Sequence, residues 1–287
     1  MIAITGANGQ LGRLVINALL KKMPSEEIVA AVRSPEKATD LAELGVQVRE
    51  ADYAKPELLS AAFRGVDKLL LISSSEVGRR TPQHQAVIEA AKEAGVELLA
   101  YTSLLRADTS EMLLANEHRE TEQALTASGI PYAILRNGWY TENYAHTIAA
   151  ALAYGTFIGA AQDGKIASAS RQDYADAAAE VLTGSDVANK IYELAGDTAF
   201  TLAEFTAEIA RQSGKTINYV NLPEAEFAHV LKGAGLLVPL AEVLADSEAN
   251  AAKGSLFDDS HTLSALIGRP TTSWQQVVTD NVSKTSA

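Results

Sequence analysis

A glycine-rich turn near the start of the chain constrains the fold more than any other feature. The segment from Thr5 to Gly12 reads TGANGQLG and spaces its glycines as GxxGxxG. It follows a short apolar run, Ile2–Thr5, and it precedes Gln10–Lys22, where apolar residues recur every fourth position, as on one face of a helix. A strand, a glycine turn and an amphipathic helix in this order are typical of the opening of a βαβ unit.

The chemistry of this turn predicts that it binds an anion. Gly6 permits the tight turn out of the strand, Gly9 has no side chain to keep a pyrophosphate from the backbone, and Gly12 lets the helix approach the sheet. The helix N-terminus adds N–H groups and about half a positive charge. We therefore predict nucleotide binding, with packing alone as the alternative role of the glycines. The predicted cofactor-binding residues of the turn are Gly6, Ala7, Asn8, Gly9, Gln10, Leu11 and Gly12.

Short apolar strands alternate with helical patterns through the first half of the chain. The strand candidates are Ile2–Thr5, Ile28–Val32, Val46–Glu50, Lys68–Ile72, Leu98–Thr102 and Tyr132–Leu135. The helix candidates are Gln10–Lys22, Pro35–Leu44, Pro56–Arg64, Pro82–Ala94 and Ser110–Ser128. Repeated βα units with strands that are apolar nearly throughout predict the α/β class, as a doubly wound parallel sheet of the Rossmann type.

The rhythm of the pattern changes after about residue 155. Strand candidates are Ile191–Leu194 and Ile217–Asn221, and helix candidates are Thr201–Gln212, Glu224–Gly233 and Pro239–Ala252. Thr201 and Glu204 have the spacing of a capping box at a helix start. We predict a nucleotide-binding domain over residues 1–155, with 165–195 returning to it, and a smaller C-terminal α/β lobe on the substrate side over 196–287. Residues 283–287 are expected to be frayed.

The residues that follow the next three strands indicate which nucleotide is bound. NAD sites usually have an acidic residue after the second strand, but Arg33 stands there, and a guanidinium can bind a 2′-phosphate through charge-assisted hydrogen bonds. We therefore predict NADP(H), with a solvated surface arginine as the alternative. Asp52 is placed to accept a hydrogen bond from adenine or to cap a loop. Ser73, Ser74 and Ser75 are small enough for the cofactor ribose to approach closely.

Composition excludes several classes of function. A net charge of −12 argues against a nucleic-acid or anionic-membrane surface, and the lack of cysteine excludes disulfides and thiolate chemistry. The five histidines lack metal-ligand spacing, so we predict no metal site.

With no signal peptide or membrane-spanning run, the expected location is the cytoplasm. Arg79 and Arg80 are interpreted as a solvated pair. The oligomeric state stays open, with a homodimer as one alternative.

A second motif adds a family resemblance. Residues 130–143 read IPYAILRNGWYTEN, and Leu266–Pro270 reads LIGRP. With the glycine turn and Arg33, these segments make the chain resemble, nearly end to end, the NmrA-like atypical short-chain dehydrogenases/reductases, and among them the bacterial NADPH:quinone oxidoreductases. The resemblance implies a flavin-free, two-electron hydride transfer from NADPH to a quinone. It also implies that Arg171 turns toward the cofactor, although pairing with a nearby carboxylate is an equal alternative. The residues that it places around the nicotinamide are Asn137, Gly138, Trp139, Tyr140, Thr141 and Glu142.

The sequence departs from ordinary short-chain dehydrogenases at the proton donor. Their Tyr-x-x-x-Lys pair is absent, and Leu114 and His118 stand in its place. A quinone is a better hydride acceptor than a ketone and needs less help from an acid, so the absence favours a quinone. We predict Asn143 and Tyr140 as neutral donors to the reduced oxygen. His118 either orients the cofactor ribose or is an ordinary hydrogen-bonded histidine. A redox sensor that binds NADP without turnover is the main alternative function, and a sugar-nucleotide epimerase is weakened by the missing pair.

Overall fold

The computed structural model describes residues 1–285, which fall into two compact units. The first unit holds residues 1–107, 116–137 and 171–192, and the second holds 108–115, 138–170 and the chain from 193 onward. The domain boundaries near residues 155 and 196 stay a prediction. In the part of the chain that is described, no helix has both the length and the apolar character that crossing a membrane requires.

A seven-stranded sheet forms the centre of the first unit, in the order β3-β2-β1-β4-β5-β6-β8. Every neighbouring pair from β3 to β6 is parallel. The strand order reverses between β1 and β4, and in doubly wound sheets the carboxyl ends at such a point form the ligand crevice. The strands are β1 (Ile2–Thr5), β2 (Ile28–Val32), β3 (Gln47–Glu50), β4 (Lys68–Leu71), β5 (Leu98–Leu104), β6 (Tyr132–Asn137) and β8 (Lys190–Leu194).

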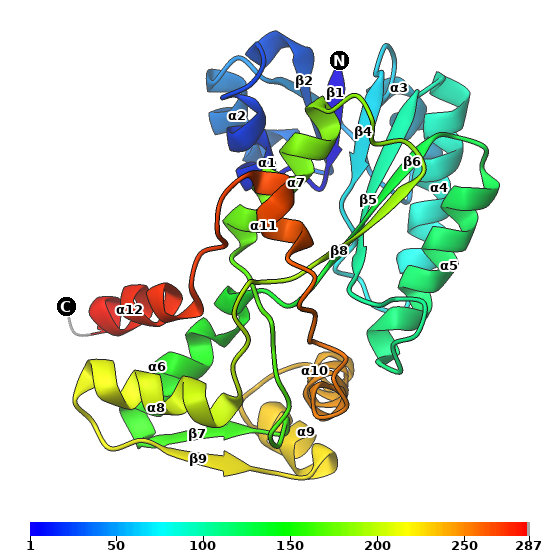
Figure 1. The fold of residues 1–287 in the computed structure, drawn as a ribbon. Coiled ribbons are helices and arrows are strands. Elements are labelled where there is room, and N and C mark those ends of the chain that lie inside the picture. The colour runs from blue at the N-terminus through cyan, green and yellow to red at the C-terminus, as the bar shows by residue number, and fades with distance from the viewer. Residues whose placement is uncertain (286–287) are drawn as a thin grey trace. The chain divides into compact units, whose positions relative to one another are not determined.

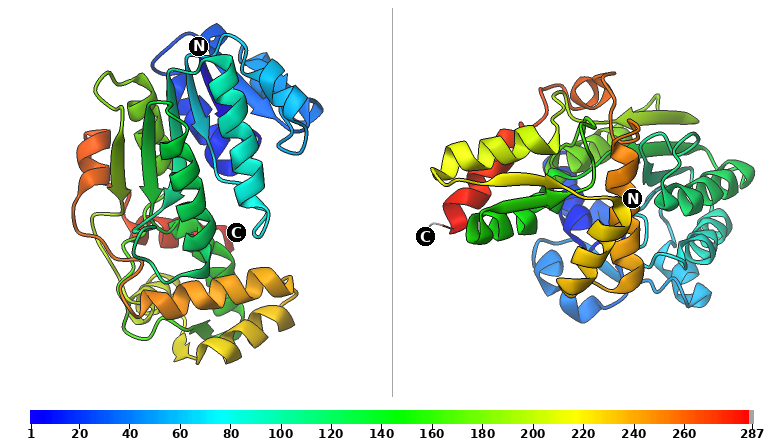
Figure 2. Two further views of the ribbon diagram at one scale, coloured as in Figure 1. Left: turned by 90° about the vertical axis from the view of Figure 1, so that its right-hand side faces the viewer. Right: turned by 90° about the horizontal axis from the view of Figure 1, so that it is seen from below.

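Helices cover both faces of this sheet (Figures 1 and 2). On one face α1 (Gln10–Leu19) packs against α7 (Arg171–Thr183). On the other face lie α3 (Pro56–Ala62), α4 (Arg80–Ala94) and α5 (Leu113–Ala127), and their apolar residues form one buried cluster with alternate residues of the strands. Because both faces are buried, the strands are apolar nearly throughout, as the sequence predicted.

The second unit contains a small sheet and an aromatic core. Strands β7 (Thr156–Gly159) and β9 (Asn218–Asn221) pair in parallel. Tyr144, Phe157 and Phe205 pack their rings with centroids 5.2 to 6.4 Å apart. A 3₁₀ turn, Thr141–Tyr144, precedes the helices. These are α6 (Ala145–Tyr154), α8 (Leu202–Ser213), α9 (Glu224–Gly233), α10 (Val238–Ala251), α11 (Thr262–Ile267) and α12 (Trp274–Thr285).

Several sequence predictions are confirmed and others need correction. The capping box at Thr201 is present in both directions. The predicted helix Pro35–Leu44 is wrong, because Ala38 leaves the helical region and separates a 3₁₀ turn, Pro35–Lys37, from α2 (Thr39–Glu43). Helix α12 continues through Thr285, so residues 283–285 are helical rather than frayed, and 286–287 lie outside the described residues.

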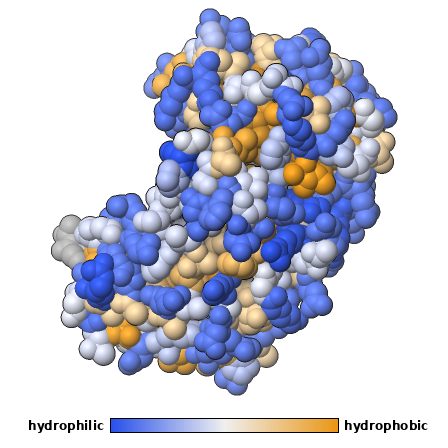
Figure 3. Space-filling model, in the orientation of Figure 1, coloured by the Kyte–Doolittle hydropathy of each residue, from blue (hydrophilic) through white to orange (hydrophobic). Residues whose placement is uncertain are grey.

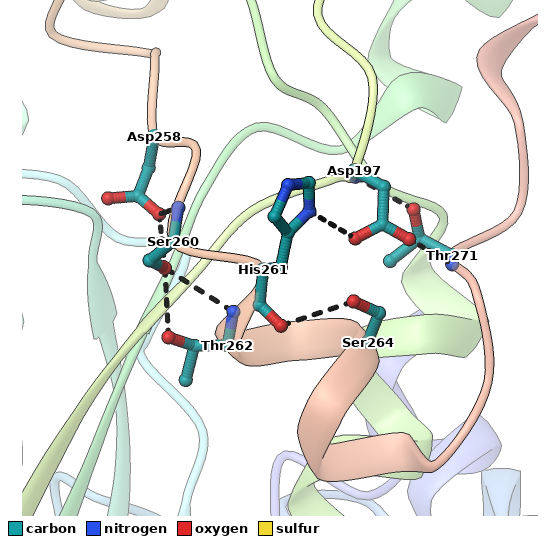
Figure 4. A network of polar contacts seen from close by, with 7 residues as sticks. All are labelled: Asp197, Asp258, Ser260, His261, Thr262, Ser264 and Thr271. Carbon is teal, nitrogen blue, oxygen red and sulfur yellow. Dashed lines mark hydrogen bonds and ion pairs between the residues drawn. The ribbon is translucent and has the colours of Figure 1, made fainter.

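A polar network in the second unit holds the segment before α12 (Figure 4). The Asp197 carboxylate accepts hydrogen bonds from the Thr271 N–H at 2.8 Å and from the His261 ring at 3.0 Å. Burial opposes ionisation of Asp197, but hydrogen bonds from Ser264, Thr271 and His261 together lower its pKa. The network therefore ties the chain after β8 to the residues on either side of α11 and the LIGRP segment, His261 and Thr271. Elsewhere, the face drawn in Figure 3 is mostly polar, with apolar residues in a few patches.

Candidate functional site

A pocket of about 440 Å³ opens at the carboxyl ends of β1, β2 and β4 in the first unit. It lies at the point where the strand order reverses, which is where this architecture places its ligands. The predicted residues that line it are Gly6, Asn8, Gly9, Arg33, Asp52, Ser73, Ser74 and Ser75. Sequence reasoning missed several of its other lining residues, among them Lys37, Tyr53 and Glu76.

The glycine turn is closed by its own backbone. Gly6 has a φ of +59°, and its carbonyl accepts the Gly9 N–H at 2.8 Å. A Cβ on Gly12 would lie 2.6 Å from the Gly6 oxygen, so the close approach that requires this glycine is to the turn itself. Helix α1 starts after Gly9 with no side-chain cap and no acidic residue in its first turn. Its positive end therefore stays available to an anion.

Arg13 joins the glycine turn to the segment after β2. Its guanidinium donates to the Asn8 side-chain oxygen and to the Lys37 carbonyl, both at 3.1 Å, and pairs with Asp40. Asn8 in turn donates to the Ser34 carbonyl at 3.2 Å. These bonds fix the distance between the turn and the loop that carries Arg33 and Lys37, so both walls of the pocket are held before any ligand arrives.

Two cations from the segment after β2, Arg33 and Lys37, line the pocket, and one carboxylate, Glu76, lines it from the loop after β4. The Arg33 side chain is 71% exposed and pairs with Glu76 at 3.2 Å, while Lys37 lines the same wall. Glu76 also contacts Arg79 at 3.2 Å and Gln83 at 3.0 Å. Arg33 is thus neither fully solvated nor buried, and Glu76 holds it at the rim.

Asp52 and Tyr53 line the pocket beyond β3. One Asp52 oxygen accepts the Ala54 N–H at 3.0 Å, which is the loop-capping role weighed from the sequence. Adenine binding by Asp52 stays a prediction. The Tyr53 hydroxyl donates to the Ile72 carbonyl at 3.4 Å, and burial raises the pKa of Tyr53 to about 12, so the ring is neutral.

The loop after β4 is held by buried side chains from three other elements. Three consecutive backbone N–H groups each donate to a side-chain acceptor at 2.9 to 3.1 Å. The pairs are Ile72 to Thr5 Oγ1, Ser73 to Thr102 Oγ1, and Ser74 to His84 Nε2. Arg80 donates to the Ser74 carbonyl at 2.6 Å and is buried, so the interpretation of Arg79 and Arg80 as a solvated pair is wrong for Arg80.

His118 lies inside the first unit rather than on its surface. It is 5% exposed, and its Nδ1 forms a 2.7 Å hydrogen bond with the Tyr101 hydroxyl. Burial first, and then the charge of Arg80, lowers its pKa well below the usual range, so the ring is neutral. His118 is thus a hydrogen-bonded histidine, which is one of the two roles expected from the sequence. Its other expected role, contact with the cofactor ribose, stays a prediction.

The predicted nicotinamide segment starts at the end of β6. Asn137 is 4% exposed, and its side-chain oxygen has no hydrogen-bond partner among the described residues. Gly138 to Asn143 belong to the second unit, where the Gly138 N–H donates to the Leu194 carbonyl at 2.8 Å. Thr141 is buried and bonds Ser168 at 2.8 Å, so its side chain serves packing.

The remaining predicted site residues differ in exposure. Trp139 is buried, Tyr140 and Glu142 are half-buried, and Asn143 is exposed. Arg171 is the first residue of α7 and is half-buried. None of these five residues lines the pocket described above, and their contact with a cofactor or substrate stays a prediction.

Comparison with known proteins agrees with this geometry. A family model described as NAD(P)H-binding matches residues 6–185. The chain is 59% identical over 278 residues to quinone oxidoreductase 2 of Escherichia coli, covering 97% of each. The crystal structure of E. coli NADPH-dependent quinone oxidoreductase QOR2 complexed with NADPH superposes with a TM-score of 0.96, covering 98% of this chain and 99% of that one. An NmrA-like family domain-containing oxidoreductase of Aspergillus flavus is 28% identical, over 93% of this chain and 90% of its own. The chain therefore belongs to the NmrA-like NAD(P)H-binding family.

Proposed function

We propose that this protein is an NADPH-dependent quinone reductase. The reduced cofactor supplies a hydride, which is one proton with two electrons, from C4 of its nicotinamide. The quinone accepts this hydride and takes up one further proton from solvent to become a hydroquinone, and NADP⁺ leaves. The relative that is 59% identical over nearly the whole chain, together with the NADPH named in its structure, supports this assignment.

The observation that carries the proposal is the set of groups around the pocket in the first unit. An uncapped helix N-terminus and the open backbone at Gly9 fit a pyrophosphate. Arg33 and Lys37 fit a further phosphate on the neighbouring ribose. An acidic chain binds a cofactor with this much negative charge only where local cations and dipoles oppose the overall field.

Glu76 does not cancel the attraction of Arg33 for a phosphate on the ribose. It pairs with Arg33 through one oxygen at 3.2 Å and with Arg79 through the other at 3.2 Å. An exposed ion pair of this kind is worth less than about 1 kcal/mol, whereas a guanidinium can bind a phosphate with two hydrogen bonds. A 2′-phosphate can therefore displace Glu76 from Arg33 at little cost.

The residues predicted around the nicotinamide offer polar groups of the right kind. The Asn137 side-chain oxygen is buried with no hydrogen-bond partner among residues 1–285, so it fits the N–H groups of a carboxamide. Tyr140 and Asn143 would donate hydrogen bonds to the reduced quinone oxygen. His118 is buried and neutral, and its Nδ1 is hydrogen-bonded to Tyr101. We therefore assign His118 a role in orienting the cofactor ribose and not a role as proton donor. This leaves solvent as the source of the second proton.

One assay tests the assignment. Purified protein is mixed with NADPH and a benzoquinone, and the loss of absorbance from the reduced nicotinamide is followed. Turnover that depends on both reactants is the expected result. Tight NADPH binding without turnover would select the redox sensor instead. Replacement of Asn143 by alanine is expected to slow turnover, and full turnover in that variant would remove Asn143 from the proposed site.

Arg33→Ala tests the cofactor preference. Loss of one charge-assisted contact to a 2′-phosphate is expected to weaken NADPH binding by about tenfold or more, and to leave NADH binding unchanged. The two dissociation constants are measured on the same protein preparation. Equal losses for NADPH and NADH would show that Arg33 does not read the 2′-phosphate.

The cytoplasmic location and the homodimer also remain proposals. Fractionation of the source cell tests the first, and analytical ultracentrifugation tests the second.

A further inference from the structure

The loop Ser73–Ser75 lines the pocket, and side chains from other elements hold its backbone. Its Ser74 N–H donates to Nε2 of His84, a residue of α4 with no exposed surface. The Ser74 carbonyl accepts from Arg80, and its hydroxyl accepts the Glu76 N–H at 3.1 Å. His84 is therefore the side chain that accepts the hydrogen bond from the central amide of this loop.

The hydrogen bonds around His84 determine where its ring proton lies. Because the Ser74 N–H donates to Nε2, that nitrogen carries no hydrogen. The proton of the neutral ring is then on Nδ1, which donates to Thr121 Oγ1 at 2.9 Å. The Thr121 hydroxyl donates onward to the Glu117 carbonyl at 2.8 Å, so each group has one consistent role.

The surroundings keep His84 in this form. Burial, followed by the charge of Arg80, lowers its pKa to about 3, so the ring is neutral at any ordinary pH. The Tyr101 ring packs edge-on against it, with centroids 5.4 Å apart. The Glu117 carboxylate accepts hydrogen bonds from the Gly78 and Arg80 N–H groups, both at 3.0 Å. These bonds tie the chain between Ser75 and α4 to α5.

We propose that His84 is a positioning residue for cofactor binding: through Thr121 it is locked in the Nδ1–H form, and its Nε2 fixes the Ser74 amide so that the loop Ser73–Ser75 is preorganised against the dinucleotide. This inference rests on the proposed function, since the dinucleotide is the cofactor assigned to the pocket. A loop that is already ordered loses less entropy when the ligand binds.

Substitutions at His84 separate this role from simple packing. His84→Leu removes the acceptor and leaves the Ser74 N–H without a partner, so the dissociation constant for NADPH is expected to rise about tenfold. His84→Gln restores an acceptor near the Nε2 position and is expected to return within about threefold of the wild-type value. The KM for NADPH should follow the dissociation constant, while kcat should change much less, because the loop binds the cofactor and not the quinone.

Thr121→Val tests the proton lock with its own control. It removes the acceptor of the Nδ1 proton while keeping the shape, so a rise of about threefold in the NADPH dissociation constant is expected. Thr206→Val is the matched control, since Thr206 is also buried and donates to a carbonyl one turn back at 2.7 Å, but forms no hydrogen bond with a histidine among residues 1–285. It should leave NADPH binding unchanged.

A spectroscopic measurement supports the test if His84→Leu does not fold. Long-range ¹H–¹⁵N correlation of the wild-type protein, with the His84→Gln spectrum for assignment, should show the proton of this ring on Nδ1. A proton on Nε2 would overturn the inference, and so would a folded His84→Leu protein with wild-type NADPH affinity. If the wild-type protein bound no NADPH, the proposed function would fail. The position of the His84 ring proton would still test whether Thr121 holds the ring in the Nδ1–H form.

Discussion

Two buried glutamates, one in each unit, are accommodated in opposite ways. Glu122 on α5 and Glu248 on α10 are each 8% exposed. Glu122 accepts the Ser103 hydroxyl at 2.5 Å and pairs with Arg136 at 2.8 Å. Glu248 accepts the Ala160 N–H at 2.7 Å, and no lysine or arginine among residues 1–285 forms an ion pair with it. Burial raises the pKa of Glu248 to about 7.

The comparison shows two ways in which this protein accommodates a buried carboxyl: an ion pair at Glu122 and a retained proton at Glu248. In the first unit, the cation beside Glu122 offsets the cost of removing its charge from water. In the second unit, the carboxyl avoids that cost by keeping its proton up to neutral pH. The units should therefore respond differently to substitution and to pH.

Breaking the buried pair is expected to have the largest effect. Arg136→Met leaves the Glu122 charge buried without its cation, which should lower the free energy of unfolding by about 3–5 kcal/mol. The double variant Glu122→Gln/Arg136→Met should recover much of this loss, because both charges are gone. Urea unfolding measures both values. Equal losses in the single and double variants would show that packing, rather than the uncompensated charge, sets the cost.

The second effect is a pH dependence from Glu248. The folded state keeps this proton up to pH about 7, whereas the unfolded state releases it near 4.5. The folded state thus binds more protons between these values, so stability falls as pH rises through this window, by about 3 kcal/mol in total. Glu248→Gln should remove this fall and be more stable than the wild type at pH 8. If the free energy of unfolding changed with pH in parallel for the two proteins, a raised pKa of Glu248 would be contradicted.

The smallest effect is expected at an ion pair whose arginine stays in water: the Arg211 side chain is 69% exposed, whereas that of Glu208 is 14% exposed. Arg211 donates to Glu208 at 2.6 Å on α8, and this bond lowers the pKa of Glu208 to about 2. Its contribution is present above pH 4.5 and is lost as pH falls toward 2. Arg211→Ala should change thermal unfolding at pH 7 less than either buried site does, because solvent screens the pair. A larger change than at Glu248 would contradict the role assigned to burial.

Features that depend on neighbouring residues could be predicted from the sequence. The glycine turn, the strands of the large sheet and the capping box at Thr201 are read from residues within a few positions of one another. The same holds for Arg33 and the serines after β4, because parallel strands end at one edge of the sheet and bring these positions into one pocket. The family is likewise carried by short local motifs.

Features that depend on distant partners could not be predicted in this way. Strand β7 is four residues long and pairs with β9 about sixty positions later. Helix α7 is rich in buried alanine and is covered on several sides, so it lacks the one-sided pattern of a surface helix. The buried hydrogen bonds of His84 with Thr121 and of His118 with Tyr101 join residues that are 37 and 17 positions apart.

Calorimetric titration of the purified protein with NADPH tests the central claim most directly. The glycine turn, the helix N-terminus and the two cations beside them should give a saturable heat of binding, with NADPH bound at least about tenfold more tightly than NADH. A folded protein that releases or absorbs no heat with NADPH or NADP⁺ would contradict the account.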